Sequence, residues 1–190
     1  MNFVGKVKRF QWKSRKSLTL VAILLLAIIF LRIKYYRYST EIKLAKGKAE
    51  TVWEYVADFS NLKQLNPSIV DFLILNDSGN FETWHYTVQY KEVSSNWPYL
   101  TSATLAHYEV KHVNKLVQAY YINSNHTSCM AFGCICLTTY SSYDFTQQGN
   151  GVDVFELVNY QCPVIFSGLC RKNIEHQREL IARNLIKHFS

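Results

Sequence analysis

The feature that most constrains this chain is an uninterrupted apolar run at residues 18–31, LTLVAILLLAIIFL. Basic residues flank it on both sides, and Trp12, Tyr35, Tyr36 and Tyr38 lie where aromatic side chains gather at a bilayer interface. A spanning helix usually needs about 20 apolar residues, but flanking Lys and Arg side chains extend a short run by reaching towards the headgroups. The residues that follow, RIKYYRY, are bulky and basic, unlike a signal-peptide cleavage site. The run therefore predicts an uncleaved membrane anchor.

The charges divide the chain into a basic tail at residues 1–16, a transmembrane anchor with its flank at 17–37, and one domain at 38–190. Residues 1–37 hold nine of the 21 Lys and Arg residues and no acidic residue, which leaves 12 basic and 14 acidic residues for the domain. The net charge of +7 therefore comes from the anchor region. We expect a membrane as a partner and no nucleic acid, because a nucleic-acid surface needs its positive charge on the folded domain. Protein partners are not indicated.

The cues on membrane side conflict. Six basic residues precede the apolar run and six follow it closely, and the tail is slightly the more basic, which favours a lumenal or external domain. On that side Asn76 and Asn125, both in Asn-X-Ser/Thr sequences, would be open to glycosylation. Five cysteines, at 129, 134, 136, 162 and 170, form an odd set that suits free thiols in a reducing compartment. The side stays open, and the short run suits a thin bilayer such as the endoplasmic reticulum.

The domain begins with a strand and two short helices. Residues 38–44 alternate apolar and charged side chains, which predicts a strand that ends at a turn at Lys46-Gly47. Residues 49–59 carry apolar side chains three and four positions apart, as in an amphipathic helix. A second helical turn stops before Pro67, because the residue preceding a proline is disfavoured in helical conformation.

The rest of the domain is predicted to be strands and one long helix. Short strands separated by turns are expected at residues 69–75, 81–90, 105–110, 116–122, 134–140 and 152–160. After Pro163, apolar residues spaced for one buried stripe predict a helix that runs to the C-terminus. The pattern is that of an α+β domain with an antiparallel meander.

The segment AKGKAETVWEYVADFSNLKQLNPSIVDF, residues 45–72, resembles the START-like, helix-grip superfamily SRPBCC, which includes polyketide cyclase/dehydrase and lipid-transport families. The likeness lies in Val52-Trp53, in the Asp58-aromatic pair, and in Asn66-Pro67 before the sheet. The C-terminal helix agrees in position and length, whereas residues 81–160 carry no family motif. The resemblance implies a curved antiparallel sheet wrapped around the C-terminal helix, two short helices after the first strand, and a cavity between sheet and helix.

In this family the cavity takes apolar, lipid-like ligands, and an aromatic content of 15% suits such a lining. The predicted ligand-binding residues lie on strand faces and on the helix stripe: Trp84, Tyr86, Tyr90, Tyr108, Tyr120, Phe155, Phe166, Ile174, Ile181 and Leu185. The resemblance further implies a gate over the cavity mouth, formed by Phe59, Leu62 and Leu65.

No catalytic residue, metal site or cofactor is predicted. The strands contain polar residues that could transfer protons, but no spacing singles out a pair: His85, His107, Glu109, His112 and Glu156. No zinc-ligand spacing, phosphate loop, dinucleotide fingerprint or nucleophile elbow is present. Three functions stay open: binding or transfer of an apolar ligand beside a membrane, a cyclase- or dehydratase-like enzyme for a membrane-soluble substrate, and an anchored adaptor with a filled core.

Overall fold

Seven antiparallel strands form one sheet in the order β1-β7-β6-β5-β4-β3-β2. The structure is a computed structural model and describes residues 17–26, 29–80, 82–94, 97–114, 119–130, 133 and 135–190. The strands are β1 (Ile33–Leu44), β2 (Ile69–Gly79), β3 (Thr83–Ser94), β4 (Trp97–Asn114), β5 (Ala119–Met130), β6 (Ile135–Gln148) and β7 (Gly151–Pro163). Several strands extend beyond their predicted ends, because ladder pairing continues past the positions that alternate apolar and polar residues.

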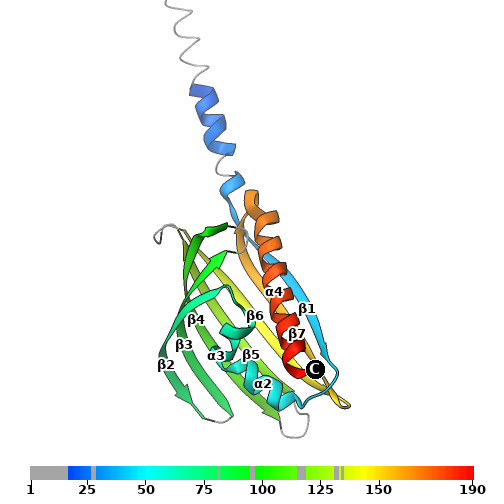
Figure 1. The fold of residues 1–190 in the computed structure, drawn as a ribbon. Helices are drawn as coiled ribbons and strands as arrows, with labels where there is room; N and C mark the ends of the chain where they lie inside the picture. Colours follow the sequence, from blue (N-terminus) through cyan, green and yellow to red (C-terminus); the bar gives the residue numbers. More distant parts are fainter. Residues whose placement is uncertain are drawn as a thin grey trace, which may run out of the picture.

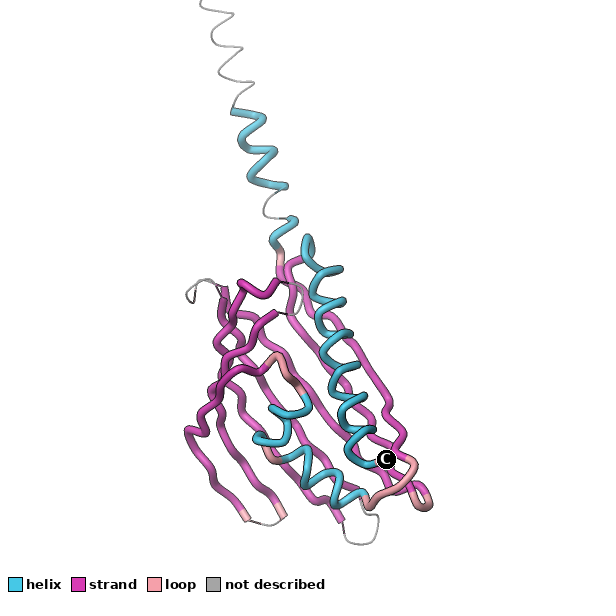
Figure 2. The backbone as a smooth tube through the Cα atoms, viewed as in Figure 1, coloured by secondary structure: helices cyan, strands magenta, loops and turns pink. Residues whose placement is uncertain are grey.

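The sheet curves, and one long helix lies across its hollow face (Figure 1). This helix, α4 (Ser167–Phe189), follows a 3-10 turn, η1 (Val164–Phe166), and the short helices α2 (Ala49–Ala57) and α3 (Phe59–Leu65) cover another part of the same face (Figure 2). The element order and the curved antiparallel sheet confirm the predicted α+β, helix-grip arrangement.

The N-terminal region differs from the predicted boundaries. Residues 17–26 and 29–31 are helical, and β1 already begins at Ile33 instead of residue 38. Tyr35, Tyr36 and Tyr38, expected at a bilayer interface, therefore belong to β1 and pair with β7. Among the described residues, none of the helices combines the length and the apolar character required to cross a bilayer.

The two short helices are defined by the residues that the sequence singles out. Asp58 separates them, and its Oδ1 accepts a hydrogen bond of 2.8 Å from the backbone N–H of Ser60, which caps α3. Val52 and Trp53 of α2 are buried against the sheet, with Trp53 Nε1 donating to the Tyr121 carbonyl at 3.2 Å. Asn66 ends α3 as predicted, and its Oδ1 accepts from the backbone N–H of Ser68 at 3.2 Å.

Four of the five cysteines form disulfides, so the prediction of free thiols is wrong for them. Cys129 of β5 is bonded to Cys136 of β6, because the register of this hairpin places the two residues directly opposite each other. Cys162 near the end of β7 is bonded to Cys170 in the first turn of α4, which folds back over that strand end. The fifth, Cys134, lies outside the described residues.

Candidate functional site: a polar cavity under the long helix

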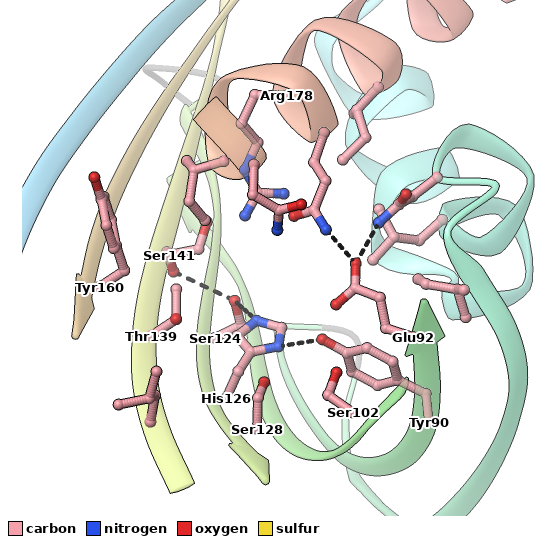
Figure 3. A pocket seen from close by; sticks show the side chains of 18 of the residues that line it. Tyr90, Glu92, Ser102, Ser124, His126, Ser128, Thr139, Ser141, Tyr160 and Arg178 are labelled. Atoms are coloured by element: carbon pink, nitrogen blue, oxygen red, sulfur yellow. Dashed lines mark hydrogen bonds between the residues drawn. The ribbon is translucent and has the colours of Figure 1, made fainter. Parts of the chain in front are cut away.

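A cavity of about 180 Å³ lies between the hollow face of the sheet and α4 (Figure 3). For scale, an engineered apolar cavity of roughly 150 Å³ binds benzene. In this conformation the space therefore suits a molecule of one or two rings, or several waters, and is too small for a long acyl chain.

One part of the lining is apolar. It consists of aliphatic, aromatic and sulfur-containing side chains from the sheet and the helices: Val56, Leu62, Ile69, Tyr90, Tyr108, Ile122, Met130, Leu137, Tyr143, Tyr160, Cys170, Ile174 and Ile181. The other part is polar: Asn66, Glu92, Ser102, Ser124, His126, Ser128, Thr139, Ser141, Gln161, Asn173, Gln177 and Arg178. The cavity is thus amphipathic, with nearly as many hydrogen-bonding side chains as apolar ones.

A positive charge at the cavity belongs to Arg178 of α4. Its Nε lies 3.0 Å from Oε1 of Glu156 on β7, and the Ser141 hydroxyl donates to the same oxygen at 2.9 Å. The Arg178 side chain is 13% exposed and that of Glu156 1%, so each charge depends on the other. Burial works to lower the pKa of Arg178, but the charge of Glu156 and its neighbours outweighs burial, and the net shift is upward. The guanidinium therefore stays charged beside the cavity.

A second carboxyl group, that of Glu92 on β3, lines the cavity itself. Its Oε1 accepts a hydrogen bond of 2.6 Å from Gln177 Nε2 and one of 3.4 Å from Asn66 Nδ2 (Figure 3). Burial raises the pKa of Glu92, and the hydrogen bond from Asn66 and the charge of Arg178 oppose that rise. The Asn-Pro motif that ends α3 thus also supplies a donor to the cavity.

A half-buried histidine at the cavity connects two hydroxyl groups. His126 Nδ1 lies 3.0 Å from the Tyr90 hydroxyl, and its Nε2 lies 2.8 Å from the Ser124 hydroxyl (Figure 3). Burial, assisted by the charge of Arg178, lowers the pKa of His126 from 6.5 to about 3, so the ring is neutral near pH 7. A neutral imidazole has one hydrogen-bond donor and one acceptor. One of the two hydroxyl groups therefore donates its hydrogen bond to the ring, and the other accepts a hydrogen bond from it.

Together, these groups suit a ligand with an apolar body and several polar atoms. Pockets of this kind use apolar walls for affinity and a few polar groups to set orientation. No cluster of three or more His, Cys, Asp or Glu side chains suited to a metal ion occurs in the described part of the chain.

Compared with known protein families and with curated proteins, the sequence matches none. Solved structures do match. A START superfamily protein from Mycobacterium smegmatis superposes with a TM-score of 0.54 at 13% identity, over 80% of this chain and 96% of that one. The di-domain ARO/CYC protein BexL gives 0.60 at 9% identity, over 98% of this chain and 60% of that one. A hypothetical protein from Helicobacter pylori gives 0.57 at 10% identity, over 82% and 88%.

This chain has a START-like fold. At these low identities the likeness concerns the fold alone. It gives no information about the residues that line the cavity of this chain.

Within the START-like fold, the predicted ligand-binding residues fall into three groups. Tyr90, Tyr108, Ile174 and Ile181 line the cavity, as does Leu62 of the predicted gate. A second group belongs to the hydrophobic core or packs against it and does not line the cavity: Trp84, Tyr86, Tyr120, Leu185, Phe59 and Leu65. Phe155 and Phe166 lie outside, 42% and 47% exposed.

Simple physical reasons explain why residues of the second and third groups do not line the cavity. Tyr86 is sealed in the core, where its hydroxyl donates to the Ala57 carbonyl at 2.7 Å. Phe155 lies on the outer face because strand residues alternate, and β7 turns its neighbour Glu156 inward instead. Phe166 belongs to η1, ahead of the part of α4 that faces the sheet.

The polar strand residues considered for catalysis separate in the same way. His85, His107 and Glu109 line an open groove on the outer face of the sheet. His112 packs against Tyr120 and Trp53, with ring centroids 4.7 and 6.3 Å apart. Glu156 is the one of these five that is fully buried, and it forms an ion pair with Arg178.

The polar cavity residues were not predicted, although the sequence carries a signal for them. Ser124 and His126 share a strand face with Tyr120 and Ile122, so the alternation that buries the latter pair also turns the former inward. Arg178 lies four residues after Ile174 and three before Ile181, on the same helical stripe. A polar residue at a position where the apolar pattern predicts burial is the sequence signal for such a cavity residue.

Proposed function

We propose that this chain is a membrane-anchored, START-like protein that binds a small amphipathic molecule in the cavity under α4. The ligand would have an apolar ring or short chain and polar atoms that meet Arg178, Glu92 or His126. The observation that carries this proposal is the amphipathic lining of a cavity of about 180 Å³. Water alone could fill such a space, but the aromatic walls would then have no apolar partner.

The membrane part of the proposal is supported by what surrounds the end of the apolar run. The backbone N–H of Val164 donates to the Arg32 carbonyl at 3.0 Å, which joins the start of β1 to η1. Beside this junction Ile165, Phe166 and Leu169 are 55%, 47% and 45% exposed, and the N-terminal helix meets the domain at this end of α4 (Figure 1). Exposed apolar groups next to an anchor would lie against the bilayer surface, from which a membrane-soluble ligand would come.

Ligand capture by the full-length chain tests the proposal. The protein would be purified in nanodiscs from a eukaryotic expression host, and small molecules that remain bound would be identified by native mass spectrometry and chromatography. We expect one dominant class of amphipathic molecule in stoichiometric amount. An empty protein, or a spread of unrelated lipids that matches the nanodisc alone, would contradict the proposal.

Two neighbouring threonines provide a matched pair of variants. Thr139 lines the cavity, whereas Thr138 on the same strand faces outward, with its hydroxyl 3.5 Å from the Tyr35 hydroxyl. Thr139→Phe places a ring in the cavity and should remove the bound molecule, and Thr138→Phe should retain it. Equal loss in both variants would show that the effect comes from damage to β6 and not from occupation of the cavity.

An enzyme that works in the same cavity is a second candidate. It is favoured by the hydrogen-bonded chain of Tyr90, His126 and Ser124, which could relay a proton to or from a bound substrate. The captured molecule and its derivatives would be incubated with the protein and with His126→Gln. Turnover that the variant abolishes while it still binds the molecule would establish catalysis, and unchanged recovery of the molecule would establish a binding protein.

A further inference from the structure

The two disulfides indicate the chemical environment in which the domain folds. Cys129–Cys136 closes the β5–β6 hairpin, and Cys162–Cys170 ties the end of β7 to α4. Structural disulfides form and persist in secretory and extracellular compartments, and cytosolic thiols are kept reduced. Four of the five cysteines are therefore paired in two disulfides, and the fifth is not part of either bond. The odd number of cysteines no longer favours a reducing compartment.

The sequence Asn76-Asp77-Ser78 lies where an attached sugar would fit. β2 is an edge strand of the sheet, and all three residues are exposed. A register shift between Ile74 and Asn76 marks a bulge at Leu75, directly before Asn76, which itself pairs with Thr87 of β3. β2 and β3 run down to their turn at the end of the sheet away from the N-terminal helix (Figures 1 and 2). A glycan on Asn76 would therefore extend into solvent, far from a membrane at the other end.

The second such sequence, at Asn125, lies in a different setting. Asn125 is in the middle of β5, paired with His107 of β4 on one side and Tyr140 of β6 on the other. Its side chain is half-buried in the groove of the outer face, and within the described residues its buried Oδ1 has no hydrogen-bond partner. A sugar there would have to leave between the two neighbouring side chains.

We propose that the domain folds on the oxidising side of a secretory membrane and carries one N-linked glycan, on Asn76 and not on Asn125. The orientation rests on the proposed anchor, with the basic tail (Lys6 to Lys16) in the cytosol, in keeping with the positive-inside rule. The glycan itself does not depend on ligand binding.

Both modifications use reactants that this compartment supplies. In glycosylation the Asn76 side-chain nitrogen attacks the anomeric carbon of a lipid-linked oligosaccharide. A carbon–nitrogen bond forms, the carbon–oxygen bond to the lipid diphosphate breaks, and the amide loses one proton. Each protein disulfide forms as two thiols lose two protons and pass two electrons to the disulfide of an oxidising folding enzyme.

The experiment is expression of the full-length chain in insect cells, followed by endoglycosidase treatment of the membrane fraction. We expect one glycan that Asn76→Gln removes and Asn125→Gln retains. Ser78→Ala should also remove it, although Asn76 is intact, whereas Ser78→Thr should keep it, which separates a lost acceptor sequence from misfolding. Maleimide labelling in denaturant should modify one of the five cysteines before reduction and all five afterwards.

Three results would overturn the proposal: no endoglycosidase-sensitive mass, a glycan that persists in Asn76→Gln, or five reactive thiols before reduction. Ligand recovery from the same membranes is a separate measurement. A glycosylated, disulfide-bonded chain that captures no small molecule would refute the proposed function and leave this inference standing. A chain that captures a small molecule but carries no glycan and has five free thiols would refute this inference and leave ligand binding standing.

Discussion

The hollow face of the sheet has two halves, one filled with side chains and one left open. Under α2 and α3, the aromatic rings of Phe59, Tyr86 and Tyr108 pack together, with centroids 5.8 Å apart for Phe59–Tyr108 and 4.7 Å for Tyr86–Tyr108. Under the first half of α4, the same sheet presents polar groups around the cavity. β5 crosses both regions, with Tyr120 in the filled half and Ile122, Ser124 and His126 at the cavity.

The difference shows how a small domain keeps a space open. Apolar side chains gain free energy from every contact, so they close gaps until the interior reaches crystal-like density. Polar groups gain only from partners with the right geometry, as in the Arg178–Glu156 ion pair and in the Tyr90–His126–Ser124 chain. The filled half supplies stability, and the open half is held in place by an ion pair and by hydrogen bonds.

Truncation of Phe59 tests the role of the filled half. The side chain is 2% exposed, and Phe59→Ala should lower the free energy of unfolding by about 4 kcal/mol, since it removes buried area and leaves a void. Urea unfolding measures the change. Phe155→Ala, at a site 42% exposed, is the matched control and should cost no more than about 1 kcal/mol. Similar losses in the two variants would contradict the division into a stabilising half and an open half.

Removal of the cavity arginine tests the open half. Arg178→Met leaves the carboxylate of Glu156 buried without its partner and should cost about 3 kcal/mol in urea unfolding. The double variant Arg178→Met with Glu156→Gln removes both charges and should regain most of that loss. If the double variant is as unstable as the sum of the two single variants, the two side chains do not act as a pair.

The disulfide between β7 and α4 should stabilise the wall of the cavity. Cys162 and Cys170 enclose a loop with a sequence separation of 8, for which chain entropy gives about 2.5 kcal/mol. Cys170→Ser should lower the free energy of unfolding by this amount in oxidising buffer. In buffer with a reductant, the difference between the variant and the parent chain should disappear, and a difference that persists would indicate lost packing instead.

Acid should weaken the open half through His126. Its folded-state pKa, about 3, lies below the unfolded value of 6.5, so the unfolded chain binds a proton that the folded chain does not. The stability is complete above pH 6.5 and declines as the pH falls towards 3, with about 1 kcal/mol lost between pH 6.5 and 5.5. His126→Gln should remove this part of the pH dependence, while Glu92, whose pKa is raised, should continue to titrate. An unchanged pH profile in the variant would show that His126 titrates normally.

Much of the fold could be predicted because its signals are local. Alternation of apolar and polar residues predicted the strands, and apolar residues three and four positions apart predicted the helices. Asn66-Pro67 predicted the end of α3. The site was less accessible. Tyr90, Tyr108, Ile174 and Ile181 line the cavity as expected residues of a buried face, but Arg178, Glu92 and His126 were not singled out. A polar residue on a buried face looks the same in sequence whether it faces a cavity, another side chain or solvent.

The sequence by itself determined the apolar run, the order of the elements and the faces that turn inward, because these depend on periodicity and on turn residues a few positions apart. Only the tertiary structure decided which inward residues pack and which surround a space. The Arg178–Glu156 pair and the Cys129–Cys136 bond depend on strand register and on the placement of α4. Such placement results from contacts summed over the whole sheet, so no short segment of the chain contains it.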